Sequence, residues 1–241
     1  MKYLNFFLPI VLLIIIYNTQ YLYADIIRSN YILVSEPYLL DKLLFGIQLG
    51  SNILTPSEFL QQHTHWILDF ICGFFYISYI PLFVSISAYF TFWNKQKDSW
   101  QIMWSWLFLN VIGFSTYYWL PAAPPWYTTL YGTDLPANLA VSANVAGCER
   151  FDKLIGIGVF KWFYGNSQDV FGSIPSLHVA YPFLSMLYAI KFRSLIFTNL
   201  LFTLIMSFAA VYLNHHYVID VLLGFVYSVF SYLAFSTKKQ S

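Results

Sequence analysis

Six apolar segments, separated by more polar stretches, limit the fold more than any other feature of the sequence. They cover residues 4–24, 67–93, 100–120, 176–190, 195–213 and 217–235. A helix needs about 20 apolar residues to cross the hydrocarbon core of a bilayer. Only 10% of the 241 residues are charged, whereas a soluble domain carries roughly 25%. The chain therefore lacks the charged surface of a soluble domain, and we expect a multi-spanning membrane protein. The net charge of +1 and the lack of a basic run also argue against a nucleic-acid partner.

These segments predict an all-α fold, a six-transmembrane-helix bundle in a single integral-membrane domain over residues 1–241. Residues 1–66 supply the first span and interfacial helices, and residues 67–235 form the core. The stretch 38–49 is apolar on most of its surface but carries Asp41, Lys42 and Gln48, which predicts a helix lying in the interface.

Two further segments predict ordered structure outside the spans. Thr55 can cap a helix that starts at Pro56, and Glu58 completes a capping box. The long segment 121–172 is rich in Pro, Gly, Asn and aromatic residues. Loops of this length are usually functional or disordered, and the aromatic content favours an ordered extracytoplasmic cap.

The basic residues predict the orientation in the membrane, since short cytoplasmic segments carry an excess of Lys and Arg. The short segments expected on one side of the membrane carry a single acid, Asp98. They carry the bases Lys95, Lys97, Lys191, Arg193, Lys238 and Lys239. Both termini are thus expected in the cytoplasm. The long loop and the turn 214–216 then face the periplasm, the cell exterior or an organelle lumen.

The chain has two cysteines, Cys72 and Cys148. They are too few for a disulfide framework or a four-thiolate metal site. Two unrelated thiols are the favoured interpretation, and a single bridge is the alternative.

Two histidines and an aspartate lie where outward-facing helix ends are expected to meet. Pro175 and Ser176 begin the fourth span and place His178 in its first turn. The free amides and partial positive charge of a helix N-terminus bind anions such as phosphate. His216 and Asp220 are four residues apart, a spacing that puts both on one face of a helix. A carboxylate bonded to one imidazole nitrogen leaves the other free as a nucleophile.

This set of residues is suited to two-step phosphoryl transfer. His216 would attack phosphorus and form a phosphohistidine, and His178 would protonate the departing alcohol oxygen. A second alcohol or water would then discharge the intermediate, with His178 acting as the base. The chemistry requires no metal and no cofactor.

The residues that carry this chemistry resemble a known family. Pro175-Ser176-Leu177-His178 and His215-His216-Tyr217-Val218-Ile219-Asp220 look like the second and third motifs of the type-2 phosphatidic acid phosphatase superfamily. The resemblance covers about residues 67–235. It implies His216 as the nucleophile, Asp220 as its activator and His178 as the general acid, on the outer face of a six-helix bundle.

The sequence departs from that family in its basic residues. The family's first motif has a lysine and an Arg-Pro pair that hold phosphate, but no Lys or Arg occurs here between Lys97 and Arg150. The segment Pro121-Ala122-Ala123-Pro124-Pro125-Trp126-Tyr127 stands in that place. Ala209 and Ala210 occupy the positions of the third motif's Ser-Arg pair.

These departures make the chain similar to the inositol phosphorylceramide synthase branch. The resemblance rests on the Pro-Pro-Trp-Tyr segment, Pro-Ser-Leu-His and the His-His-Tyr motif. It implies transfer of a phosphoinositol head group from a phospholipid to ceramide. Such a donor is a phosphodiester, which carries one charge fewer than a monoester and is compatible with the loss of two arginines.

Several other residues are candidates for substrate binding. Arg150 and Lys153, with Lys161, could neutralise phosphate, and solvated loop charges are the alternative. Pro125, Trp126 and Tyr127 could line a head-group pocket, although aromatic residues are common at membrane interfaces. His215 could orient substrate or play a capping role, and Ser176 lies at the expected phosphate site.

Two alternatives remain open beside the transferase. Water instead of an alcohol as acceptor would make the protein a lipid phosphate phosphatase acting on phosphatidate or a polyprenyl diphosphate. A transporter or membrane interaction protein could keep the helices without chemistry, but such a relative typically loses a catalytic residue. His178, His216 and Asp220 are all present.

Overall fold

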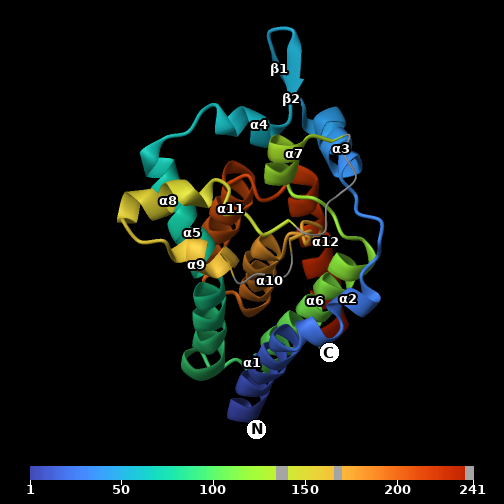
Figure 1. The fold of residues 1–241 in the computed structure, drawn as a ribbon. Coiled ribbons are helices and arrows are strands. Elements are labelled where there is room, and N and C mark those ends of the chain that lie inside the picture. Colours follow the sequence, from blue (N-terminus) through green and yellow to red (C-terminus); the bar gives the residue numbers. More distant parts are fainter. Residues whose placement is uncertain (134–140, 166–169, 237–241) are drawn as a thin grey trace.

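The computed structural model describes residues 1–133, 141–165 and 170–236, and its chain is mostly helical. This confirms the all-α prediction (Figure 1). The long helices are α1 (Lys2–Asn18), α5 (Trp66–Ala88), α6 (Trp100–Trp119), α10 (Leu177–Phe192), α11 (Ile196–Tyr212) and α12 (Val218–Phe235). A π-helical turn, Tyr89–Trp93, extends α5. Of the residues used to predict orientation, Lys238 and Lys239 lie outside the described part of the chain.

Length and composition identify membrane-crossing candidates among the described helices. Trp66–Trp93 and Val218–Phe235 are long and apolar enough to cross a membrane, and α1 and α11 are apolar but shorter. Large apolar side chains also point outward from these helices, for example Phe197 at 76% exposure and Leu233 at 65%. Such faces suit a lipid environment. The chain is therefore a membrane protein.

Helix α10 lies at the centre of the bundle and packs against α5, α6, α11 and α12 (Figure 1). Ala180, Leu184 and Tyr188 on this helix are fully buried. Gly224 of α12 lies close to the start of α10, because a Cβ added there would lie 2.6 Å from the carbonyl oxygen of Ser176. The absence of a side chain at Gly224 lets α12 reach the start of α10.

The first apolar segment forms a shorter helix than predicted, because α1 ends at Asn18 rather than near residue 24. Asn18 Nδ2 donates to the carbonyl oxygen of Ile14, and Thr19 Oγ1 donates to that of Ile15. Side chains that bond the backbone in this way compete with helix continuation. The chain continues as a 3₁₀ turn, Gln20–Leu22, and a short α2, Ala24–Ile27.

The predicted helix over residues 38–49 is present in part, and its placement in the interface stays a prediction. Helix α3 spans Ser35–Phe45, and the following residues form a hairpin of β1 (Ile47–Leu49) and β2 (Asn52–Leu54). Gly50, at φ +61°, allows the tight turn between the strands. The predicted helix start at Thr55 is confirmed. Helix α4 (Pro56–Gln61) has the capping box, with Thr55 N donating to Glu58 at 2.7 Å.

The described parts of segment 121–172 contain α7 (Pro125–Tyr131), α8 (Cys148–Ile155) and α9 (Val159–Gly165). Residues 134–140 and 166–169 of the predicted cap lie outside the description. Helix α8 packs on α5, where the Phe151 ring lies over Gly73. Cys72 and Cys148 are both buried and free, so they form no bridge.

Backbone hydrogen bonds connect residues 122–126 to the two segments that carry the histidines. Ala122 N donates to the carbonyl oxygen of Phe171 at 2.8 Å, and Trp126 N donates to that of Asn214 at 3.1 Å. Gly172 also pairs with Ala122 in an isolated bridge. The Pro- and Ala-rich segment therefore holds the start of α10 and the α11–α12 turn in place.

We expect Gly224→Ala to destabilise the protein, because its methyl group would press on the Ser176 carbonyl. Overpacking of this kind costs about 1–3 kcal/mol, which thermal unfolding of the detergent-solubilised protein would show as a lower Tm. Gly158→Ala is the matched control, since its added Cβ would lie at an ordinary contact distance of 3.5 Å from Cβ of Lys161. Equal Tm values for the two variants would contradict the assigned close approach.

Candidate active site

The structure brings together two histidines that are 38 residues apart in the sequence. His178 lies in the first turn of α10, and His216 lies in the turn between α11 and α12. Nδ1 of His178 is 3.2 Å from Nε2 of His216. Both residues line the same cavity, so the predicted convergence of the two helix ends places two imidazoles in hydrogen-bond contact.

His216 is oriented by a backbone carbonyl and by Asp220. Its Nδ1 is 3.0 Å from the carbonyl oxygen of Ser173 and 3.5 Å from Oδ2 of Asp220. A carbonyl oxygen only accepts, so Nδ1 carries the hydrogen and Nε2 presents its lone pair toward His178. The carboxylate was expected to make this bond itself. Because His216 precedes the first helical residue, Val218, the two side chains are not related by regular helix geometry.

Asp220 is fully buried, and its carboxylate connects the segment before α10 to the start of α12. Its Oδ2 accepts from Ser173 Oγ at 2.5 Å and from Tyr217 N at 2.9 Å. The second bond belongs to a capping box that begins α12. Ser173 thus holds the histidine through its carbonyl and the carboxylate through its hydroxyl. Ser173 was not among the predicted site residues, because every residue has a backbone carbonyl and its use leaves no mark on residue type.

Helix α10 begins at Leu177, where the sequence predicts an anion site. The first backbone N–H groups of a helix have no partner within it and can bind an anion. Ser176, the N-cap, donates its own N–H to the carbonyl oxygen of Asp220 at 3.0 Å. Its hydroxyl oxygen is buried without a hydrogen-bond partner among the described residues.

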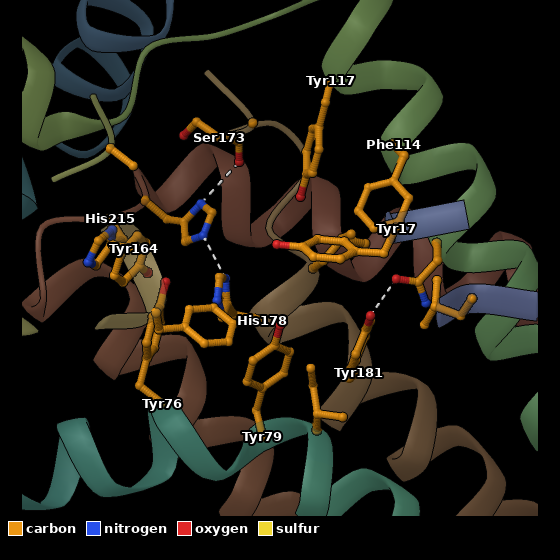
Figure 2. A pocket seen from close by; sticks show the side chains of 18 of the residues that line it. Tyr17, Tyr76, Tyr79, Phe114, Tyr117, Tyr164, Ser173, His178, Tyr181 and His215 are labelled. Carbon is orange, nitrogen blue, oxygen red and sulfur yellow. Dashed lines mark hydrogen bonds between the residues drawn. The ribbon is translucent and has the colours of Figure 1, made fainter. Parts of the chain in front are cut away.

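A cavity of about 430 Å³ extends from the histidines between α1, α5, α6 and α10. Figure 2 shows tyrosines from these helices and from α9 around it, among them Tyr17, Tyr79, Tyr117, Tyr164 and Tyr181. The His178 ring stacks on Tyr76 at 4.2 Å between centroids. The residues that line the cavity, all within the described part of the chain, include no Lys or Arg.

The predicted phosphate-neutralising side chains are engaged elsewhere. Arg150 bonds Asp69 at 2.6 Å and Gln61 at 3.0 Å, and its guanidinium lies 5.1 Å from the centre of the Tyr212 ring. It thereby ties α8 to α4, α5 and α11. Lys153 is exposed and pairs with Glu149 on its own helix. Neither Arg150 nor Lys153 lines the cavity, and nor does the exposed Lys161.

Of the three predicted head-group residues Pro125, Trp126 and Tyr127, Trp126 lines the cavity, next to the lining residue Pro124. Pro125 begins α7, and Tyr127 packs edge-on against Phe171 at 5.4 Å. The three neighbouring residues thus have different surroundings. Trp126 faces the candidate site, and Tyr127 stabilises the segment that precedes Ser173.

His215 lines the cavity as a neutral group. Its ring stacks on Tyr164 at 4.8 Å, and its Nε2 lies 3.2 Å from the carbonyl oxygen of Val145 and 3.3 Å from Cys148 Sγ. Burial, with the nearby His216, lowers the pKa of His215 to about 3. An imidazole with that pKa is uncharged at neutral pH, so His215 adds no positive charge for phosphate.

A buried carboxylate from α3 reaches the start of α12. Asp41 Oδ1 accepts from the backbone N–H of Ile219 at 3.1 Å. Burial raises the pKa of Asp41 to about 6, and the nearby Asp220 contributes in the same direction. Helix α3 therefore contacts the element that carries Asp220.

Comparisons with known proteins point to one family. A model of the PAP2 superfamily matches residues 45–234. A phosphoinositol dihydroceramide synthase of Bacteroides thetaiotaomicron is 38% identical over 86% of this chain and 68% of its own length. The catalytic subunit of inositol phosphorylceramide synthase from Schizosaccharomyces pombe is 30% identical over 79% of this chain. Its Saccharomyces cerevisiae counterpart is 34% identical over 55%.

The chain spans less than half of either yeast protein, 44% of the first and 32% of the second. No solved structure matches the chain.

We expect Asp41→Asn to change how stability depends on pH. The folded protein holds the Asp41 proton more tightly than the unfolded chain does. Protonated Asp41 therefore contributes stability below its ordinary pKa of 3.8. This contribution is lost as the pH rises through the folded-state pKa of about 6. Asparagine keeps the acceptor for Ile219 N but does not ionise. The Tm of the variant relative to wild type should thus increase between pH 4 and pH 7, in contrast to the exposed control Glu149→Gln. A pH-independent difference for Asp41→Asn would contradict this assignment.

Proposed function

The chain belongs to the PAP2 superfamily, and from this premise we propose that it is a lipid phosphotransferase. It moves a phosphoinositol-like head group from a phospholipid donor to a lipid alcohol, with His216 as the nucleophile. The supporting relatives are named as inositol phosphorylceramide and phosphoinositol dihydroceramide synthases. The observation that carries the proposal is the histidine pair in the wall of a largely apolar cavity whose described lining residues include no Lys or Arg.

The first proposed step transfers the head group to the protein. His178 Nδ1–H donates to His216 Nε2 in the resting site, and the donor phosphate replaces this bond. His216 Nε2 then forms a bond to phosphorus while the bond from phosphorus to the diacylglycerol oxygen breaks. His178, doubly protonated once the anionic phosphate is bound, gives its Nδ1 proton to that oxygen and is left as a neutral imidazole. The hydrogen bond from His216 Nδ1 to Ser173 and the charge of Asp220 stabilise the phosphohistidine cation.

The second proposed step transfers the head group to the acceptor. The hydroxyl oxygen of the lipid alcohol attacks phosphorus, and His178, now unprotonated at Nδ1, takes the hydroxyl proton. The phosphorus–nitrogen bond breaks, and His216 returns to its neutral state. Neither step is routed through a metal or cofactor.

The electrostatics of the cavity support a phosphodiester donor. A phosphodiester carries one negative charge, and the amides at the start of α10 with nearby hydroxyl groups supply neutral hydrogen-bond donors for it. A monoester dianion would need more compensation in an apolar cavity. Ser176 and Trp126 belong to the proposed substrate site, whereas Arg150 and Lys153 act in structural ion pairs.

The proposed membrane arrangement has six spans: α1, α5 with its π-turn, α6, α10, α11 and α12. The N-terminus of α1 and the end of α12 lie at the end of the molecule opposite the hairpin (Figure 1). We place that end in the cytoplasm, because the basic loops lie there. The histidine site and the cap then face the periplasm or lumen, and residues 67–235 form the catalytic core of a single domain.

We expect His216→Ala to lower head-group transfer by on the order of 10³-fold or more, because no other group would form the covalent intermediate. The assay uses purified protein and phosphatidylinositol with a labelled head group. His63→Ala is the control, since His63 is exposed and outside the cavity lining. Wild-type protein should also yield an acid-labile labelled adduct that His216→Ala lacks. Unchanged turnover in His216→Ala would refute the nucleophile.

The same label distinguishes transfer from hydrolysis. With ceramide present, label should appear in a new lipid, and EDTA should leave the rate unchanged. Release of water-soluble head group alone would contradict the transferase assignment and favour a lipid phosphatase. Loss of activity with EDTA that Mg²⁺ restores would show that a metal takes part.

A further inference from the structure

Two tyrosines of α5 pack against the ring of the proposed general acid. The His178 ring stacks on the Tyr76 ring, with centroids 4.2 Å apart and planes 14° from parallel. The Tyr79 ring lies 4.6 Å from the same imidazole at an angle of 47°. The two tyrosines are three residues apart, a spacing that puts both side chains on one face of α5. Figure 2 shows this pair, the aromatic clamp, beside His178.

The described protein offers no carboxylate to a protonated His178. Its Nδ1 contacts Nε2 of His216, and the described residues that line the cavity include no Asp or Glu. Asp220 lies on the far side of His216, 3.5 Å from Nδ1 of that ring. An unpaired cation is costly in an apolar cavity. The proposed first step nevertheless needs His178 as a cation, so groups other than a carboxylate must stabilise it.

The titratable side chains around His178 are otherwise neutral or basic, and four elements supply them. They are Tyr76 and Tyr79 on α5, Tyr117 on α6, His215 and His216 in the α11–α12 turn, and Tyr181 on α10 itself. Tyr117 donates its hydroxyl hydrogen to the carbonyl oxygen of Pro175, and Tyr181 donates to Asn110. The aromatic clamp is therefore the group in direct ring contact with His178 that can favour a positive charge.

An aromatic ring stacked on an imidazole favours the imidazolium over the neutral form. The face of a tyrosine ring is electrostatically negative and attracts a cation whose centre lies within about 6 Å. Planar cations such as guanidinium bind these faces by stacking. Both rings of the aromatic clamp lie within this distance of His178. The attraction is strongest where water is excluded, as it is for the fully buried Tyr76.

Stacking alone does not charge a buried imidazole, as His215 shows. Its ring stacks on Tyr164 at 4.8 Å and on Tyr76 at 5.5 Å, yet it is neutral. His178 differs because its Nδ1 faces Nε2 of His216, where the proposed donor phosphate binds. The phosphate anion and the aromatic clamp would then act together on the same cation.

We propose that the aromatic clamp stabilises the doubly protonated state of His178 while the donor phosphate is bound. This inference rests on the proposed function, in which His178 gives a proton to the leaving oxygen. Tyr76 and Tyr79 are positioning residues, because they act through the charge and orientation of His178 and make no bond to the reacting atoms. Once the proton has left, the neutral imidazole no longer gains the cation attraction.

The pH dependence of the first step tests the aromatic clamp. The single-turnover rate of phosphohistidine formation from labelled phosphatidylinositol should fall as the pH rises through the apparent pKa of the acid. Tyr76→Leu should move this fall to lower pH by about one unit, because the cation loses a stacked ring. Lowering the pH should therefore restore the rate of this variant. Tyr76→Phe keeps the ring and should keep the wild-type profile.

Tyr79→Leu, at a half-buried position, should move the profile in the same direction and serves if Tyr76→Leu does not fold. Phe75→Leu is the matched control, since Phe75 lies on the same helix, packs on Phe202 at 6.3 Å and does not line the cavity. It should keep the wild-type profile. A loss of rate in the two tyrosine variants that is the same at every pH would overturn the proposal. An equal shift of the profile in Phe75→Leu would also overturn it.

A direct titration of His178 separates failure of this inference from failure of the proposed function. The protein is His216→Ala in micelles, without added lipid, and its His178 resonance in the NMR spectrum is identified by its absence after His178→Gln. Adding Tyr76→Leu should lower the titration midpoint by about one unit, whereas adding Phe75→Leu should not. If wild-type protein transfers no head group, the proposed function fails, and this titration alone decides the role of the aromatic clamp. Equal midpoints with and without Tyr76→Leu would overturn it.

Discussion

The hydrogen bonds of Ser173 hold the candidate site together. Its carbonyl oxygen lies 3.0 Å from His216 Nδ1, and its hydroxyl donates to Asp220 at 2.5 Å. The same carboxylate caps α12 through Tyr217 N. Correct placement of the proposed nucleophile therefore requires that the segment before α10 and the start of α12 are folded against each other. Gly224 permits this contact, and residues 122–126 hold the two segments through backbone bonds.

Much of this arrangement could be predicted from local sequence patterns. Apolar segment length located the long helices, and the capping box at Thr55 and Glu58 located the start of α4. His178 and His216 were expected at neighbouring helix ends, and Nδ1 of the first lies 3.2 Å from Nε2 of the second. These features depend on hydrophobic length and on residue type, which the sequence displays directly.

The features that could not be predicted depend on backbone groups and on distant partners. The contact between Ser173 and His216 uses a carbonyl oxygen, which every residue possesses. Arg150 was a phosphate candidate because it is the first basic residue after a long stretch without one. Its partner, Asp69, is 81 positions away, and no local pattern links the two. The strands after Phe45 follow from a turn at Gly50 that competes with an apolar helix signal.

The placement of Arg150 bears on the chemistry that the cavity can support. A fixed guanidinium beside the histidines would bind a dianionic phosphate strongly and would be costly to bury in an apolar cavity without one. Here the guanidinium is neutralised by Asp69, and His215 is kept uncharged by burial. Apart from the His178 proton that leaves with the alcohol, the donors that hold the phosphate in the proposed site are neutral, which suits a singly charged diester. The aromatic and aliphatic walls then favour exchange of one lipid alcohol for another over entry of water, so the scarcity of charge that marks the sequence favours transfer over hydrolysis.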